Sequence, residues 1–191
     1  MIEIIVTLII FTLVLYLIYY DMINDYNYNF KTFCKDELCS RLLQKESLDK
    51  IYKLYTFYNN LLKILPEDDI RRKKLIKRFD KNNGLFEVDP YNKKQYTSYT
   101  LNKSNIGMCM REKTPDKQLH DIETLKFVFL HELGHVCTDS YDHNKEFWYN
   151  FKWLLTHTYN NNLMQPINFK NNPIKYCTGI IIDKNPYFDY D

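Results

Sequence analysis

The amino-acid sequence predicts an α+β protein that begins with a transmembrane helix. A charge-free apolar run lies near the start of the 191-residue chain. Helical periodicity occupies the segments before residue 83 and after residue 121, and strand-like runs lie between them and near the end. Because helices and strands are segregated along the chain rather than alternating, we expect a short antiparallel sheet packed on helices.

The N-terminal element is the apolar run at residues 4–20, IIVTLIIFTLVLYLIYY. A helix of this length spans about 25 Å, and residues 1–3 extend it towards the roughly 30 Å of a hydrocarbon core. The tyrosines at its end suit a membrane interface. The run has no polar face, which argues against a core helix, and it lacks the basic start and the cleavage site of a signal peptide. We therefore predict a transmembrane anchor over residues 1–23 of a single-pass membrane protein.

The residues after the anchor indicate its orientation. Lys31, Lys35, Arg41 and Lys45 follow the apolar run, and no Lys or Arg precedes it. The positive-inside rule then predicts that the rest of the chain lies on the cytoplasmic side, with a virion membrane as the alternative location. Residues 24–46, which begin with a polar and aromatic stretch, are predicted to form a juxtamembrane stalk.

Residues 47–83 are predicted to form a helical segment with two helices. Ser47 is expected to cap the first helix, and Pro66 to end it. The second helix opens with the acidic residues 67–69 and continues through the basic stretch 71–81. This order suits the helix dipole, because negative charge is favourable at the start of a helix and positive charge at its end.

The core of the protein is predicted at residues 84–183. Short strands are expected at residues 85–88, 96–101 and 106–111, and the last two form a hairpin through a polar loop. Two helices are expected next, at residues 121–139 and 144–159. A last strand is expected at residues 176–182, and residues 184–191 form a tail.

The charge balance excludes a strongly basic nucleic-acid binder. Lys and Arg number 26 against 24 Asp and Glu, a formal net charge of +2. One basic patch, Arg71–Lys74 with Lys77 and Arg78, leaves a nucleic-acid tether as a minor hypothesis. A solvated helix face, balanced by the acidic residues 67–69, explains the same patch more simply.

The five cysteines have no CxxC spacing, which excludes a thioredoxin-like motif and a cysteine-type zinc ribbon. Scattered free thiols suit a reducing compartment. Among these cysteines, Cys137 is expected to pack in the core. His120 lies in a polar loop and is expected at the surface.

The strongest chemical signal is the segment 125–135, LKFVFLHELGH, which contains H-E-x-x-H in a helical pattern. His131 and His135 are four residues apart, so both imidazoles project from one face of the helix. Two such nitrogens can bind one zinc ion. Glu132 lies beside that face, where it reaches a zinc-bound water as a general base.

A catalytic zinc needs a third protein ligand. The chain is expected to turn after the helix, which brings His143 back to His131 and His135. Asp139 is a rival because it lies one turn further along the same face. Three ligands along a straight helix span about 12 Å, too far to share one ion. His143 is therefore the predicted ligand, and Asp139, Asp142 and Glu146 remain the alternatives.

Residues 131–155, HELGHVCTDSYDHNKEFWYNFKWLL, resemble the WLM/SprT-like zinc metallopeptidases, in particular the WLM-like proteins of large DNA viruses. The shared pattern is HELxH, then a His, then Phe147-Trp148. Residues 99–111 and 174–179 are also similar to the viral members. In the cellular WLM proteins the third His follows HELxH more closely. The resemblance implies a zincin-like domain over residues 84–183, a zinc cofactor, and activity on a protein or peptide substrate.

This chemistry needs further groups besides the ligands. Zinc would lower the pKa of its bound water to about 7, and Glu132 would take the proton and deliver it to the leaving amine. A second group is expected to stabilise the oxyanion; Tyr141, Tyr176 and His157 are the candidates. In zinc peptidases of this plan an edge strand pairs with extended substrate, and residues 106–111 are expected to do so.

The alternative function is a membrane-anchored structural component of a virion or organelle, with a non-catalytic zinc site. Structural zinc sites usually have four protein ligands. Only three convincing ligands occur here, and Glu132 has the position of a base. These two features favour a membrane-anchored zinc metallopeptidase.

Overall fold

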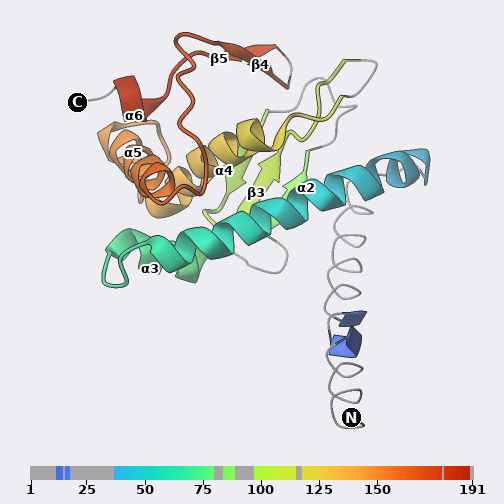
Figure 1. Ribbon diagram of the computed structural model, residues 1–191, viewed down its shortest axis with the longest axis horizontal. Helices are drawn as coiled ribbons and strands as arrows, with labels where there is room; N and C mark the ends of the chain where they lie inside the picture. The colour runs from blue at the N-terminus through green and yellow to red at the C-terminus, as the bar shows by residue number, and fades with distance from the viewer. Residues whose placement is uncertain are drawn as a thin grey trace.

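Helices and strands occupy separate stretches of the chain, as Figure 1 shows. The computed structural model describes residues 12–14, 16–17, 37–79, 84–88, 97–114, 118–177 and 179–189. Its helices are α2 (Glu37–Ile64), α3 (Ile70–Arg78), α4 (Ile122–Cys137), α5 (Lys145–Asn160) and α6 (Pro186–Asp189). Its strands are β1 (Leu85–Glu87), β2 (Tyr99–Leu101), β3 (Asn105–Met108), β4 (Ile174–Tyr176) and β5 (Ile180–Ile182). The predicted α+β class is confirmed.

The larger sheet has the order β1-β3-β2. Strands β2 and β3 form the predicted antiparallel hairpin, with Thr100 opposite Ile106. Asn102 and Lys103 in its turn have positive φ angles of 49° and 57°. Strand β1 pairs with β3 in parallel, so the sheet is mixed rather than purely antiparallel as predicted. Strand β1 lies on the far side of β3 from β2.

Helix α4 is the centre of the core, in contact with α2, α3, α5 and the sheet. Its N-cap is Asp121, the first residue of the predicted helix, and the Asp121 side chain accepts a hydrogen bond from the Thr124 amide. Leu125, Phe129 and Leu133 are fully buried along it. Full burial of such a side chain contributes about 1.5–3 kcal/mol to folding. This packing holds the helix that carries the H-E-x-x-H residues rigidly within the domain.

Helix α2 begins before the predicted cap. It runs unbroken from Glu37, so residues 37–46 are helical rather than part of a stalk, and residues 24–36 lie outside the described residues. Ser47 does not cap a helix; its buried hydroxyl donates a hydrogen bond to Glu87, at 2.6 Å. The helix ends before Pro66, as predicted. Helix α3 is capped by Asp69, whose side chain accepts from the Arg71 amide.

The predicted strand at residues 176–182 is instead an antiparallel hairpin of β4 and β5. Cys177 and Gly179, at its turn, have positive φ angles of 57° and 84° and cannot continue a strand. In Figure 1 this hairpin lies on the opposite side of α4 from α2. The predicted tail includes the short helix α6.

No helix in the described part of the chain is both long enough and apolar enough to cross a membrane. This contradicts the predicted transmembrane anchor over residues 1–23 and the predicted single-pass membrane localisation. Helix α2 has the necessary length, but charged residues are spread along it. Helix α4 is apolar but has 16 residues, fewer than the roughly 20 that a span needs. Of the predicted anchor, only residues 12–14 and 16–17 are described, as exposed helix, and the others lie outside the described residues.

Candidate metal centre

Three histidine side chains converge beside the last turns of α4. The Nε2 atom of His143 lies 3.0 Å from that of His131 and 3.2 Å from that of His135. Nitrogens bound to one tetrahedral zinc at 2.0–2.1 Å are about 3.3 Å apart. In the described part of the chain, these three side chains form a group whose ligand atoms all lie within 4.8 Å of one another. The three predicted ligands therefore lie close enough together to bind one metal ion.

His143 reaches this group because the turn after α4 is held on both sides. Lys74 and Arg78 of α3 form ion pairs with Asp139, at 2.8 and 2.6 Å. Lys103 from the β2–β3 turn donates to the carbonyl oxygen of Ser140, at 2.6 Å. The turn therefore depends on contacts from two elements that are distant in the sequence.

The alternative third ligands lie outside the histidine group. Asp139 is engaged with Lys74 and Arg78, and these partners lower the pKa of its carboxyl group to about 2. Glu146 accepts a hydrogen bond from the Asp139 amide, at 3.2 Å. Asp142 is not a member of the group either. The geometry therefore favours His143 as the third ligand.

The side chain of Phe147, from α5, packs against all three histidine rings. It stacks on His135 at 4.3 Å and meets His131 and His143 edge-on, at 4.8 and 4.6 Å. This contact needs Gly134, because a Cβ atom there would lie 3.2 Å from the Phe147 ring. The apolar contacts restrict the imidazoles to few rotamers, which favours a preformed site.

Burial keeps the imidazoles neutral at pH 7. It lowers the pKa of His131 well below the usual value, and the neighbouring His135 and His143 lower it further. Burial also lowers the pKa of His135, to about 4, and that of His143. A metal ligand must be neutral imidazole, so the three side chains are ready to bind a metal at neutral pH.

Glu132 is buried, with 4% of its surface exposed. The Thr100 hydroxyl of β2 donates to a carboxylate oxygen of Glu132, at 2.8 Å. Burial raises the pKa of Glu132 to about 7, although the Thr100 hydrogen bond opposes the shift. A carboxyl group with a pKa near neutrality is suited to general acid–base catalysis. The sequence pattern identified Glu132 but gave no sign of its partner Thr100.

A cavity of about 560 Å³ opens onto the histidines and Glu132. It lies between α4, β2 and the β4–β5 hairpin, and its polar wall includes Ser98, Thr100 and Tyr176. Its apolar wall includes Val128, Trp148, Phe151 and Ile180–Ile182. Ile180 and Ile181 are about half exposed at its mouth. The site therefore combines a polar centre with an apolar surface that is accessible to a ligand.

The prediction that residues 106–111 form an edge strand that pairs with substrate is wrong. Strand β3 has β1 on one side and β2 on the other, so its backbone groups are already paired. The edge strand beside the cavity is β2. The sequence favoured β3 as the substrate-binding strand because it is the strand nearest to α4 along the chain. The sheet order instead places β2 at the edge beside the cavity.

The three candidates for the oxyanion donor have different surroundings. Tyr176 lines the cavity and is 3% exposed, whereas Tyr141 lies at its rim and is 79% exposed. His157 is not among the cavity residues; its ring meets Trp153 at 4.8 Å, and its pKa is lowered by burial and by the nearby Arg71 charge. The structure thus removes His157 from the site.

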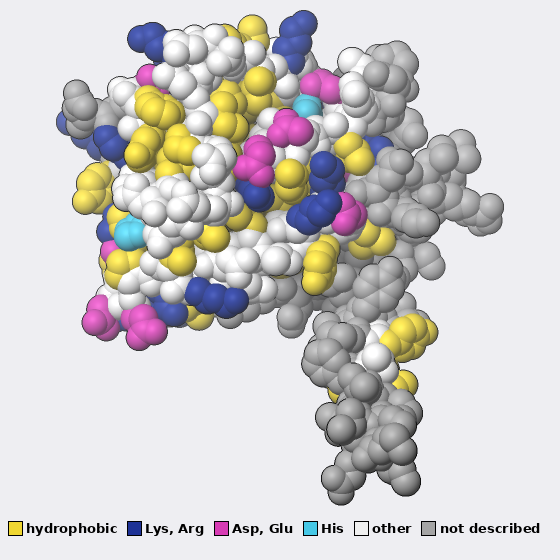
Figure 2. All heavy atoms as spheres, in the orientation of Figure 1, with side chains coloured by type: hydrophobic (Ala, Val, Ile, Leu, Met, Phe, Trp, Pro, Cys, Tyr) yellow, Lys and Arg dark blue, Asp and Glu magenta, His cyan; other side chains and the backbone are white. Residues whose placement is uncertain are grey.

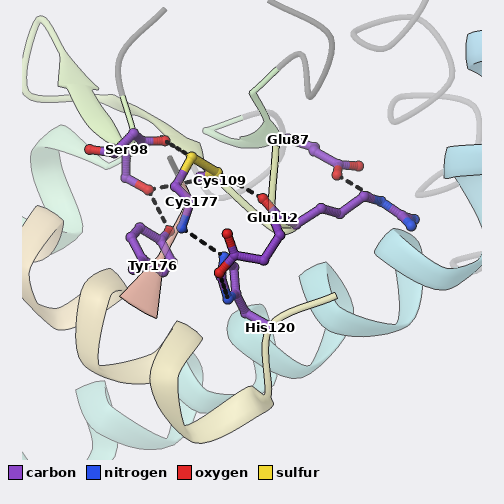
Figure 3. The surroundings of a disulfide bond; sticks show 9 residues. Glu87, Ser98, Cys109, Glu112, His120, Tyr176 and Cys177 are labelled. Atoms are coloured by element: carbon purple, nitrogen blue, oxygen red, sulfur yellow. Dashed lines mark hydrogen bonds and ion pairs between the residues drawn. A yellow bond between two sulfur atoms is a disulfide. The ribbon is translucent and has the colours of Figure 1, made fainter. Parts of the chain in front are cut away.

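A disulfide joins Cys109, after β3, to Cys177, after β4, with 5.9 Å between their Cα atoms (Figure 3). The expectation of scattered free thiols is therefore wrong for this pair, which is 68 residues apart in the sequence. Cys137 is free and buried, as predicted, and burial raises its pKa to about 12. Cys34 and the side chain of Cys39 lie outside the described residues.

His120 is buried beside the disulfide, not exposed as predicted. Its Nε2 atom accepts a hydrogen bond from the Cys177 amide, at 3.1 Å, and its ring packs on Tyr176, at 4.6 Å (Figure 3). Its Nδ1 atom lies 3.7 Å from Glu112. Burial lowers the pKa of His120 to about 4. His120 therefore packs against Tyr176, a residue of the cavity wall, without lining the cavity itself.

Acidification from pH 7 to pH 5 is expected to destabilise the wild-type protein more than a His120→Gln variant. The unfolded chain binds a proton at His120 below its usual pKa of about 6.5. The folded chain does so only below about 4. Stability is therefore lost as the pH falls between these values. Urea unfolding at both pH values, with a chelator present, measures the difference. Equal losses in the two proteins would contradict this role of His120, because the other histidines contribute equally to both.

The basic patch on α3 is largely engaged in contacts within the protein. Arg71 pairs with Asp69 and lies over the Trp153 ring, at 3.9 Å. Arg72 donates to the Leu62 carbonyl oxygen, and Lys74 and Arg78 bind Asp139. On the face in Figure 2, basic and acidic side chains are intermixed over the described part. These contacts favour a structural role over a nucleic-acid tether.

Comparisons with known proteins give relatives in viruses. No family model and no solved structure matches the chain. An uncharacterized protein of Acanthamoeba polyphaga mimivirus is 35% identical over 102 residues, 53% of this chain and 50% of that protein. An uncharacterized protein of Invertebrate iridescent virus 6 is 30% identical over 117 residues, 59% of this chain and 65% of that protein. The chain thus spans less than two thirds of either relative.

Proposed function

We propose that this chain is a zinc-dependent metallopeptidase. The observation that carries the proposal is the convergence of three neutral imidazoles, with His143 Nε2 at 3.0 and 3.2 Å from its neighbours, beside the buried carboxyl group of Glu132. Three nitrogen ligands with an adjacent carboxylate are the donor set of catalytic zinc sites. The resemblance of residues 131–155 to WLM/SprT-like metallopeptidases supports the same function.

Both the metal and the protein side chains contribute to peptide hydrolysis. Zinc, when bound, would lower the pKa of a coordinated water to about 7 and polarise the scissile carbonyl. Glu132 takes a proton from the attacking water and returns it to the leaving amine. The Thr100 hydroxyl, 2.8 Å from the Glu132 carboxylate, holds that carboxylate in place.

The surroundings of the site favour an extended polypeptide as substrate. Strand β2 forms the edge of the sheet beside the cavity, where it can pair with a peptide backbone. The apolar wall formed by Val128, Trp148, Phe151 and Ile180–Ile182 suits a large apolar side chain. We therefore propose cleavage of extended segments next to such a side chain.

Replacing His143 by Ala is expected to weaken zinc binding by more than ~10²-fold. Loss of an outer-shell partner alone weakens metal binding by about 10–100-fold, and His143 is proposed as a direct ligand. Competition with a chromophoric chelator measures the affinity. Asp142→Asn is the matched control because Asp142 adjoins His143 but is outside the histidine group. Normal affinity in His143→Ala, with loss in Asp142→Asn, would transfer the ligand role to Asp142.

The function itself is tested with the purified full-length chain and a cell lysate. New peptide termini, mapped by mass spectrometry, are expected with the zinc-loaded protein and not after treatment with a chelator. Re-addition of zinc should restore them, and large apolar residues should be enriched next to the cleavage sites. A folded, zinc-loaded protein that produces no new termini would favour the non-catalytic zinc site instead.

A further inference from the structure

We propose that Tyr176 is a further catalytic residue, whose hydroxyl donates a hydrogen bond to the oxyanion that forms on the substrate carbonyl. The inference rests on the proposed peptidase function and adds a second group to it. The reaction needs a donor that faces the reacting carbonyl from within the cavity. Three tyrosines line the cavity, Tyr99, Tyr141 and Tyr176, and of these only Tyr176 is buried.

The position of the Tyr176 hydroxyl follows from strand β2 and the residue that precedes it. Ser98 directly precedes β2, two residues before Thr100, and both residues line the cavity. Thr100 donates to Glu132, at 2.8 Å, and Ser98 lies 2.7 Å from the Tyr176 hydroxyl oxygen. The general base and the Tyr176 hydroxyl are therefore held side by side along one wall of the cavity. The space between them can receive a carbonyl group.

The Ser98 hydroxyl group lies between the Cys109 amide and the Tyr176 hydroxyl and is within hydrogen-bond distance of both (Figure 3). The Ser98 oxygen accepts a hydrogen bond from the Cys109 amide, at 3.0 Å. The Ser98 hydroxyl can then donate to the Tyr176 oxygen, and the Tyr176 proton is free to point into the cavity. Burial raises the pKa of Tyr176, and the nearby Glu132 charge adds to this effect while the Ser98 bond opposes it. The phenol therefore stays protonated at neutral pH and acts as a donor.

Two neighbours fix the Tyr176 ring. The Cys109–Cys177 disulfide attaches the residue after Tyr176 to the end of β3. His120 packs on the Tyr176 ring and accepts a hydrogen bond from the Cys177 amide. A donor that is held in place before the reaction stabilises developing charge without a cost of reorientation. This arrangement gives the disulfide and His120 a function at the site, because both act through Tyr176.

Hydrolysis of the peptide bond involves no change of oxidation state. The water oxygen forms a bond to the carbonyl carbon while Glu132 takes a proton from that water, and the electron pair of the C=O double bond moves to the carbonyl oxygen. Tyr176 donates its hydrogen bond to that oxygen and keeps its proton throughout. When the oxyanion re-forms the C=O double bond, the C–N bond breaks with its electron pair on nitrogen, and Glu132 returns the proton to the leaving amine.

Tyr176→Phe in the full-length zinc-loaded protein tests the proposal. Loss of one oxyanion donor is expected to lower kcat by about 10²–10³-fold, with KM and zinc content little changed. Tyr159→Phe is the matched control: Tyr159 is also buried, and its hydroxyl accepts a hydrogen bond from Asn185, but it does not line the cavity. It should keep the wild-type kcat. An unchanged kcat in Tyr176→Phe would overturn the inference, and the proposed function would stand if Glu132→Gln were inactive.

A binding measurement gives a readout that does not depend on turnover. Acetohydroxamate chelates zinc and presents a carbonyl oxygen to the oxyanion donor. Titration calorimetry is expected to give a Kd about 3–10-fold weaker for Tyr176→Phe, the value of one hydrogen bond, and an unchanged Kd for Tyr159→Phe. Equal affinity in wild type and Tyr176→Phe would overturn the inference even if no substrate were cleaved. If Tyr176→Phe does not fold, Ser98→Ala takes its place, and full kcat and affinity in that variant would reject the proposed donor.

Discussion

Replacing Glu132 by Gln is expected to lower peptide hydrolysis at least ~10²-fold, the low end for a positioned general base. Zinc content and melting temperature should barely change. Gln has nearly the same size as Glu, and the Thr100 hydroxyl, now 2.8 Å from the carboxylate, can donate to the Gln carbonyl oxygen instead. The amide cannot accept a proton at neutral pH. The variant therefore removes the base and keeps the packing.

The control for this experiment is Glu123→Gln on the same helix. Glu123 lies in the first turn of α4, pairs with Lys126 at 2.7 Å, and does not line the cavity. It should keep full activity. Loss of zinc or of thermal stability in Glu132→Gln would show that Glu132 is a ligand or a structural residue. Undiminished hydrolysis in that variant would mean that another group is the base.

Replacing Cys109 and Cys177 together by Ser is expected to lower the free energy of unfolding by about 4 kcal/mol. The disulfide closes a loop of 68 residues, and the loss of entropy in the unfolded chain grows with the logarithm of the loop length. A change of this size is a large part of the 5–15 kcal/mol that stabilises a typical domain. Urea denaturation under non-reducing conditions measures it.

A reductant provides the control for the disulfide. It should lower the stability of the wild-type protein to the level of the double variant and leave the variant unchanged. The hairpin β4–β5, which carries Tyr176 and Ile180–Ile182, should be the first region to gain amide hydrogen exchange, because the disulfide ties it to β3. Equal stability of the oxidised wild type and the variant would contradict the prediction.

The sequence alone identified the residues whose relation is local. His131 and His135 lie one helical turn apart, so their common face follows from the helical period. Glu132 lies next to His131 in the same motif, and Asp121 is a residue type that favours the start of a helix. The β2–β3 hairpin was also predictable, because its polar turn joins adjacent strands. His143 was predictable in outline, because a chain that ends a helix and soon starts another must turn back.

Only the tertiary structure decided the contacts between distant segments. It brings Thr100 to Glu132, Ser98 to Tyr176 and Cys109 to Cys177. It also puts β3 in the centre of the sheet, and in the part of the chain that it describes it has no helix able to cross a membrane. Periodicity records which face a side chain takes within its own element, but not which element lies opposite. The proposed ligands and the proposed base of this site were therefore identified from the sequence, whereas the groups that orient and complete it arise from packing across the fold.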